Sequence, residues 1–143
     1  MEFSEIAEHN SLIGFYRQNG LEVSDDIAAE DGAVYSIAAE INGNTVAAAT
    51  LSHRFGVYIL DYIAVDESLR RTGAGTKAVL LIRQRAKALG ADRLYITAKN
   101  PEFFKSSGFR EGSPDGVDMN ADCIGCPQFE THCVKLPMYL TLK

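Results

Sequence analysis

The apolar positions of the chain recur with two different periods, which predicts a mixture of strands and helices. Three runs rich in β-branched, aromatic and aliphatic residues, at 33–41, 45–55 and 57–65, predict strands. The Asn-Gly-Asn sequence between the first two runs indicates a hairpin, and Gly56 separates the second run from the third. These runs therefore predict an antiparallel meander.

Helical spacing of apolar residues is found on both sides of the meander. Residues 3–20 have a broad apolar face, which predicts a helix that begins the fold without a leading strand. The polar stretch 21–32 predicts a loop or a short second helix. From Thr72, a plausible cap, to Leu89 the apolar residues recur every three or four positions. A short helix is expected at 100–108, with proline near its start.

Further extended segments are expected at 93–98, 109–112 and 132–142, with a loop at 113–127. This order of elements predicts an α/β (α+β) fold with a mixed sheet. At 143 residues the chain is expected to form one domain, residues 1–143. Without a leading strand, one edge of the sheet would be exposed or shortened, and a homodimer contact could cover it. Monomer and homodimer both stay open.

The composition restricts the class of protein. Hydrophobic residues make up 46% and charged residues 23% of the sequence, so a folded domain is expected. The net charge of −5 argues against a nucleic-acid-binding face. No apolar run approaches the roughly 18 residues of a membrane span, and the acidic N-terminus is unlike a signal peptide. A cytoplasmic protein with no nucleic-acid or membrane partner is therefore expected.

The segment 68–82 places two arginines before a glycine-rich turn and an apolar helix. A Walker A phosphate loop is excluded, because no glycine lies five positions before Gly75. Gly73, Gly75 and Ala78 fit the dinucleotide pattern G-x-G-x-x-G/A, but an antiparallel meander before the loop is wrong for that fold. Arg70, Gly73 and Gly75 meet Arg-x-x-Gly-x-Gly, in which turn amides and a helix N-terminus bind pyrophosphate. A plain helix start with solvated arginines is the alternative.

Residues 57–112 carry several motifs in the order found in the GNAT superfamily of N-acetyltransferases. They are Ala-Val-Asp at 64–66, the Arg-x-x-Gly-x-Gly turn at 70–75, the amphipathic helix, a strand, an asparagine at position 100 and Phe-Phe-x-x-x-Gly-Phe at 103–109. The chain closely resembles that superfamily over these residues and fairly resembles it over the 33–55 hairpin. The resemblance implies a GNAT-like fold, with a mostly antiparallel central sheet flanked by helices and an acetyl-CoA cleft between splayed strands.

The same resemblance implies direct transfer of acetyl from acetyl-CoA to a primary amine, without a covalent enzyme intermediate. Turn amides would hold the pyrophosphate, Ile63 and Val65 would pair with the pantetheine arm, and an amide near Ile63 would polarise the thioester carbonyl. The implied acetyl-CoA-binding residues are Ile63, Ala64, Val65, Arg70, Arg71, Thr72, Gly73, Ala74, Gly75, Thr76, Asn100 and Phe104. The acceptor is not identified, although an acidic protein favours a cationic molecule such as a polyamine, lysine or an amino sugar.

The catalytic residues depart from the family pattern. Phe104 stands where the resemblance implies a tyrosine that protonates the leaving thiolate. Tyr62 is the favoured substitute as general acid. The alternatives are solvent, Tyr95, Ser106 and Tyr139. For the general base, Asp61 is the one acid within the strand before the glycine turn, and His53 is the second choice. A weakly catalytic acetyl-CoA sensor is the alternative to an enzyme.

Three cysteines cluster near the C-terminal end of the sequence. Cys123, Cys126, His132 and Cys133 could supply four zinc ligands. Neighbouring residues of a strand point to opposite faces, however, so His132 and Cys133 would not both reach one ion. Reduced, partly buried thiols are therefore favoured over zinc, and a disulfide or redox role is a third interpretation. A metal-linked or redox-linked interaction module is a further alternative function.

Overall fold

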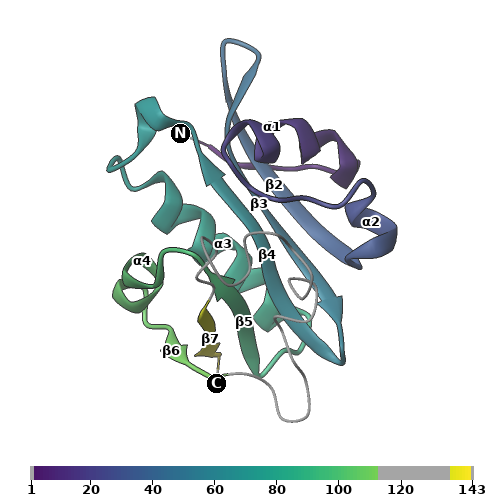
Figure 1. Cartoon of the computed structure of the whole chain (residues 1–143), viewed down its shortest axis with the longest axis vertical. Coiled ribbons are helices and arrows are strands. Elements are labelled where there is room, and N and C mark those ends of the chain that lie inside the picture. The colour runs from purple at the N-terminus through teal and green to yellow at the C-terminus, as the bar shows by residue number, and fades with distance from the viewer. Residues whose placement is uncertain (1, 113–135, 143) are drawn as a thin grey trace.

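The computed structural model describes residues 2–112 and 136–142 (Figure 1). In these residues, seven strands form one sheet in the order β1-β2-β3-β4-β5-β7-β6. The strands are β1 (Ser4–Glu5), β2 (Ala33–Ile41), β3 (Asn44–Arg54), β4 (Val57–Val65), β5 (Arg93–Ala98), β6 (Arg110–Glu111) and β7 (Leu136–Thr141). The helices are α1 (Ile13–Gln18), α2 (Ile27–Glu30), α3 (Ala74–Ala88) and α4 (Pro101–Ser106), with 3-10 turns η1 (His9–Leu12) and η2 (Glu67–Leu69).

The central meander agrees with the prediction. β2 and β4 have the expected bounds, and β3 begins and ends one residue earlier than expected. Neighbouring strands from β1 to β4 are antiparallel, as are β5 with β7 and β6 with β7, whereas β4 and β5 are parallel. The sheet is therefore mixed and mostly antiparallel, which confirms the predicted fold class.

The start of the chain differs from the prediction. A leading strand, β1, pairs with β2, and the Ile6 amide donates a hydrogen bond to the Ser36 carbonyl at 2.8 Å. Helix α1 begins only at Ile13. The expected helix over 3–20 is therefore confirmed only for 9–18, as η1 and α1, and the expected absence of a leading strand was wrong. Phe3 and Ile6 pack into clusters on opposite faces of the sheet, and a spacing of three fits that arrangement as well as it fits a helix.

The other elements lie close to their expected positions. The short second helix is α2, and α3 begins after Gly73 rather than at the expected cap, Thr72. α4 lies within the expected 100–108 helix, and β7 lies within the expected last strand. The loop expected at 113–127 lies outside the described residues.

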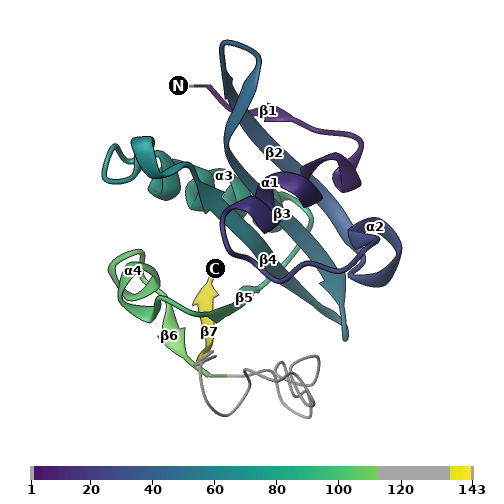
Figure 2. The same ribbon diagram turned by 45° about the horizontal axis from the view of Figure 1, so that its top comes forward.

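Two hydrophobic cores hold the helices on opposite faces of the sheet (Figure 2). α3 and α4 pack on one face, where Leu51, Ile82 and Phe104 are buried. α1 and α2 pack on the other face through Tyr16 and Ile27, which are fully buried. Each buried side chain of this size contributes roughly 1.5–3 kcal/mol, so both faces are firmly anchored.

The strands β4 and β5 separate soon after they meet. Their parallel pairing is confined to Tyr58 with Leu94 and Ile59 with Tyr95. β4 continues to Val65 and β5 to Ala98 without further pairing between them. This divergence leaves one edge of β4 without a strand neighbour in the described part of the chain.

No helix of the described residues is long and apolar enough to cross a membrane.

Candidate active site

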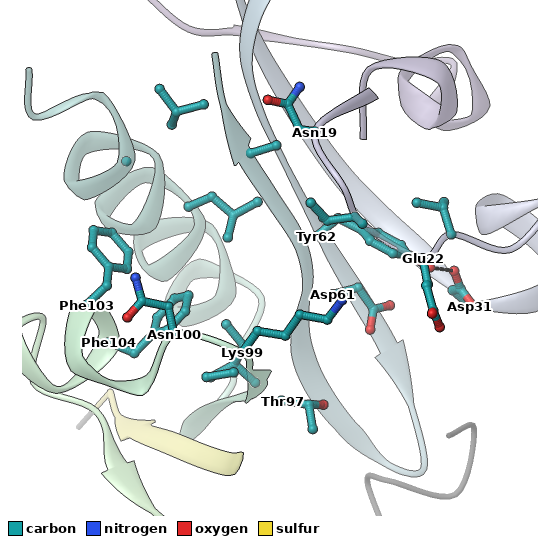
Figure 3. A pocket seen from close by; sticks show the side chains of 18 of the residues that line it. Asn19, Glu22, Asp31, Asp61, Tyr62, Thr97, Lys99, Asn100, Phe103 and Phe104 are labelled. Atoms are coloured by element: carbon teal, nitrogen blue, oxygen red, sulfur yellow. Dashed lines mark hydrogen bonds between the residues drawn. The ribbon is translucent and has the colours of Figure 1, made fainter. Parts of the chain in front are cut away.

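A cavity of about 1500 Å³ lies where β4 and β5 diverge (Figure 3). The segment after α1, strand β4, the glycine turn and the start of α4 all contribute to its lining. It brings together most of the residues that the sequence singled out. Those that line it are Asp61, Tyr62, Ile63, Ala64, Val65, Arg70, Arg71, Gly73, Gly75, Thr76, Asn100 and Phe104. Thr72 and Ala74 belong to the same turn but are not among the lining residues.

The glycine turn reverses the chain between β4 and α3. Arg71 and Gly73 have φ values of 68° and 89°, in the left-handed region that glycine tolerates best. Gly73 precedes the first helical residue, so it provides no side chain that could cap the first amides of α3. Those amides have no acceptor within the helix, and they give its N-terminus a partial positive charge. This end of the cavity is therefore suited to an anion.

Two details of the turn affect how its residues could bind a ligand. The Thr72 amide donates to the Leu69 carbonyl oxygen at 3.3 Å, so it already has a partner within the turn. Gly75 serves packing as well as ligand access, because a Cβ there would lie 3.2 Å from the ring of Phe103. The absence of a side chain at position 75 therefore allows α4 to approach the start of α3.

A β-bulge places two consecutive side chains of β4 at the cavity. Tyr62 is opposite Thr50 and Leu60 is opposite Leu51, so Asp61 is an extra residue in β4. Successive residues of a regular strand point to opposite faces. The bulge interrupts this alternation, and Asp61 and Tyr62 both line the cavity.

Asp61 is held by Arg54. The Arg54 Nη2 atom donates to Asp61 Oδ1 at 2.8 Å, and Nη1 donates to Oδ2. The Asp61 side chain is 8% exposed. Burial raises the pKa of this carboxyl group, and the hydrogen bonds and charge of Arg54 oppose the rise without cancelling it. Both carboxylate oxygens are therefore engaged, although the group accepts a proton more readily than an exposed aspartate.

Tyr62 is held by Asp31 and Tyr16. Its hydroxyl donates to Asp31 Oδ2 at 2.5 Å, and Ser24 donates to the same oxygen at 3.0 Å. The Tyr62 ring stacks on the buried Tyr16 ring, with centroids 5.1 Å apart. Burial is the main cause that raises the pKa of Tyr62, and the Asp31 carboxylate adds to it. Tyr62 therefore keeps its proton at neutral pH and directs it towards Asp31.

Arg54 and Asp31 were missed by the reading of the sequence. Both line the cavity, and Arg54 Nη1 also donates to the Asp31 carbonyl oxygen at 3.0 Å. Arg54 ends a strand and Asp31 belongs to a polar stretch, positions where charged residues are ordinary. Neither position carries a sequence signal of its own. Each matters through its contact with a residue of the bulged strand β4, which is Asp61 for Arg54 and Tyr62 for Asp31.

Phe104 is buried, 5% exposed, and lies edge-on to the rings of Phe103 and Phe109. It lines the cavity, but it has no hydroxyl to offer there. The alternative acids and the second base do not line the cavity. These are Tyr95, Ser106, Tyr139 and His53.

The cysteine cluster cannot be placed at this site. Cys123, Cys126, His132 and Cys133 lie outside the described residues. Within 2–112 and 136–142, no group of three or more His, Cys, Asp or Glu side chains could hold a metal ion. The three interpretations of the cluster therefore stay predictions.

Comparison with known families identifies the family of the chain. The sequence model of the Acetyltransferase (GNAT) family matches residues 3–109. The chain belongs to this family. Its match includes the meander, the glycine turn, α3 and α4, that is, nearly all of the elements that line the cavity. No curated protein sequence matches the chain closely enough to count as a relative.

Solved structures of other acetyltransferases share this GNAT fold. N-acetylglutamate synthase of Neisseria gonorrhoeae, complexed with coenzyme A and N-acetyl-glutamate, has a TM-score of 0.73 at 16% identity; the match covers 100% of the present chain and 36% of the synthase. A Bacillus subtilis acetyltransferase in complex with CoA has a TM-score of 0.71 at 21% identity, with 99% of each chain covered. A GNAT-family acetyltransferase of Staphylococcus aureus has a TM-score of 0.67 at 18% identity, with 99% of this chain and 100% of that chain covered.

Proposed function

We propose that this GNAT protein is an N-acetyltransferase that transfers acetyl directly from acetyl-CoA to a primary amine. The observation that carries the proposal is the cavity itself. It extends from the uncapped N-terminus of α3, along the free edge of β4, to the bulge at Asp61. An anion site, a strand edge and polar side chains follow one another along it, as an acetyl-CoA molecule and its acceptor require.

Acetyl-CoA fits the first part of this cavity. The amides at the start of α3 and the side chains of Arg70 and Arg71 would bind the pyrophosphate, since both provide positive charge. The free edge of β4 at Ile63 and Val65 would pair with the amides of the pantetheine arm, as an added strand does. CoA is bound in the Neisseria gonorrhoeae and Bacillus subtilis structures of the same fold.

The acceptor fits the opposite part of the cavity. Four carboxylates line it there, and two cationic side chains accompany them. They are Glu22, Glu30, Asp31 and Asp61, with Arg54 and Lys99. The excess of negative charge favours the approach of an ammonium group. After the ammonium group loses one proton, its nitrogen bonds to the thioester carbonyl carbon and gives up a second proton. The carbon–sulfur bond then breaks and the thiolate takes up one proton, so the products are the amide, the CoA thiol and one released proton.

The catalytic assignments belong to the same proposal. Asp61 would accept the proton of the amine, which is supported by its raised pKa and requires Arg54 to yield one carboxylate oxygen. Tyr62 would protonate the thiolate, which is supported by its position at the bulge and requires its hydroxyl to turn from Asp31. Replacing Tyr62 with Phe tests the acid: the turnover number falls about 100-fold if this hydroxyl supplies the proton.

A second candidate function is a weakly catalytic acetyl-CoA sensor. Two observations favour it: Phe104 has no hydroxyl, and both oxygens of Asp61 are engaged by Arg54. Its cofactor site would be the same, but amines would not be acetylated at an appreciable rate.

Calorimetry with acetyl-CoA and a thiol-release assay over a panel of primary amines test both candidates. Binding together with amine-dependent release of CoA is expected for the transferase. Binding without release identifies the sensor. If acetyl-CoA does not bind at millimolar concentration, both candidates are wrong.

A further inference from the structure

Two hairpin turns of the meander have similar, positive φ values but different sequences. Asn42 and Gly43 join β2 to β3 with φ values of 54° and 80°, and Phe55 and Gly56 join β3 to β4 with φ values of 58° and 75°. Two-residue hairpins of type I′ require positive φ at both positions, and Asn-Gly is a preferred sequence for them. Phenylalanine is not, because a bulky side chain is strained in the left-handed region.

Burial of the Phe55 side chain does little to offset this strain. It is 51% exposed, the most exposed large hydrophobic side chain in the described residues. Asn would suit its backbone, and a polar residue would suit its exposure. Strained backbone positions are concentrated at ligand-binding and active sites, where the side chain is needed for another purpose. Phe55 lines the cavity, whereas Asn42 does not.

The position of Phe55 shows which part of the cavity it serves. β4 runs from Val57, beside this turn, to Val65, beside the glycine turn, so Phe55 lies at the end opposite the anion site. The Arg54 guanidinium lies 5.6 Å from the centre of the Phe55 ring and also binds Asp61. The ring is therefore next to the ion pair at the acceptor end of the cavity.

We propose that Phe55 determines acceptor specificity by binding the apolar part of the amine. This inference rests on the proposed N-acetyltransferase function and narrows its acceptor class. The carboxylates around Asp61 attract the ammonium group, and the exposed ring contacts an apolar or aromatic group several bonds from the nitrogen. Amino sugars, whose rings carry hydroxyl groups, and polyamines, which carry a further ammonium group at the far end, are then poor acceptors.

A purely structural role for Phe55 predicts a different result. If the ring only shielded the pair of Arg54 and Asp61, its loss would impair every amine equally. If the ring contacts the acceptor, its loss impairs mainly amines that carry an aromatic or bulky apolar group several bonds from the nitrogen. A pair of probes that differ in one phenyl group separates these roles. Butylamine and 4-phenylbutylamine form such a pair, because both present the same primary ammonium group.

The experiment compares wild type with Phe55→Asn in the full chain. Calorimetry on the CoA-loaded protein measures the affinity for each amine, and thiol release measures kcat/KM. Wild type is expected to prefer 4-phenylbutylamine, and the variant to lose about tenfold for that amine and little for butylamine. The variant should also unfold at a higher temperature. Its folding equilibrium constant should rise about fivefold, because Asn tolerates positive φ better than Phe does.

Asn42→Phe is the matched control, since it introduces the same side chain into the β2–β3 turn, which has similar φ values and lies outside the cavity. It should lower stability and leave the preference between the two amines unchanged. Equal losses for both amines in Phe55→Asn, no loss for either, or binding of neither amine to wild type would each overturn the proposal. Binding that depends on Phe55, without acetylation of any amine, would contradict the proposed function and leave this inference standing.

Discussion

The two ends of the cavity are built by different means. At the α3 end the distinctive features are those of the backbone: a turn with left-handed residues, the first amides of a helix and the free edge of β4, with Arg70 and Arg71 beside them. At the acceptor end the lining consists of side chains held by one another. Arg54 binds Asp61 and Asp31 binds Tyr62, so segments separated by up to 31 positions in the sequence meet there.

This difference determines how each end can vary. A site made of backbone requires particular φ angles and missing side chains, so its glycines are difficult to replace. A site made of paired side chains can change its chemistry through single substitutions while the strand beneath stays the same. Under the proposed function, this architecture would combine one cofactor with an acceptor site that single substitutions can alter. The two ends should also respond differently to mutation.

The largest effect is expected at the acceptor end, for Asp61→Asn. If Asp61 is the base, the turnover number should fall about 100-fold, because general-base catalysis contributes that much or more. The affinity for acetyl-CoA should stay unchanged. Steady-state kinetics and calorimetry measure the two quantities. Asp25→Asn is the control, since it removes an aspartate paired with an arginine, Arg17, outside the cavity. Unchanged turnover in Asp61→Asn would mean that another group accepts the proton.

A smaller effect, on acetyl-CoA affinity rather than on turnover, is expected for Gly73→Val at the α3 end. A β-branched residue at φ 89° strains the turn, so acetyl-CoA binding should weaken about 10- to 30-fold. The turnover number at saturation should change little. Gly90→Val is the matched control, because Gly90 has a φ of 93° just past the other end of α3 and no contact within 4 Å of a Cβ. Equal loss of acetyl-CoA affinity in both variants would show that strain acts through the whole helix.

Phe104→Tyr is expected to increase the rate. The new hydroxyl would supply the acid that the family pattern has at this position, and a gain of about tenfold in the turnover number is expected, the lower end of what such an acid contributes. Phe109→Tyr is the control, because Phe109 is also buried but does not line the cavity. The same thiol-release assay measures both variants. No gain would indicate that Tyr62 or solvent already protonates the thiolate efficiently.

The smallest effect concerns the pH dependence of stability. The folded-state pKa of Asp61 is raised above its ordinary value of 3.8, mainly by burial, so the folded chain keeps this proton longer than the unfolded chain does. The contribution of Asp61 should therefore fall as pH rises from about 4 through its folded-state pKa. Urea unfolding at a series of pH values, compared with Asp61→Asn, measures it. If the stability of wild type relative to Asp61→Asn instead rose with pH, Arg54 would have to lower the pKa of Asp61 below its ordinary value.

The contrast between the two ends also explains what could be predicted from sequence. The meander and α3 were found because apolar residues repeat regularly over nine or more positions. The acetyl-CoA residues were proposed from the resemblance of residues 57–112 to the GNAT superfamily, in which the Arg-x-x-Gly-x-Gly turn is one of several local motifs. The acceptor end has no such pattern, since the partners of Asp61 and Tyr62 come from separate elements. The bulge that brings them together is one extra residue, which periodicity does not reveal.

The leading strand was missed for a related reason. β1 has only two residues, too few for an alternation to be recognised, and its register is set by β2. Ile6 was grouped with Leu12, Ile13, Phe15 and Tyr16 on one helical face, because a separation of seven residues corresponds to nearly two helical turns. Tertiary pairing decided between the two arrangements.

The divergence of β4 from β5 has a consequence for folding and handling of the protein. It leaves the edge of β4, a strand in the middle of the sheet, without a paired neighbour beyond Ile59 among the described residues. The backbone groups of such an edge can template the strand of another molecule. A bound pantetheine arm would pair with the backbone groups at this edge of β4. The cofactor would therefore prevent strand pairing between two copies of the chain. The ligand-free chain should therefore aggregate sooner on storage than the chain saturated with acetyl-CoA.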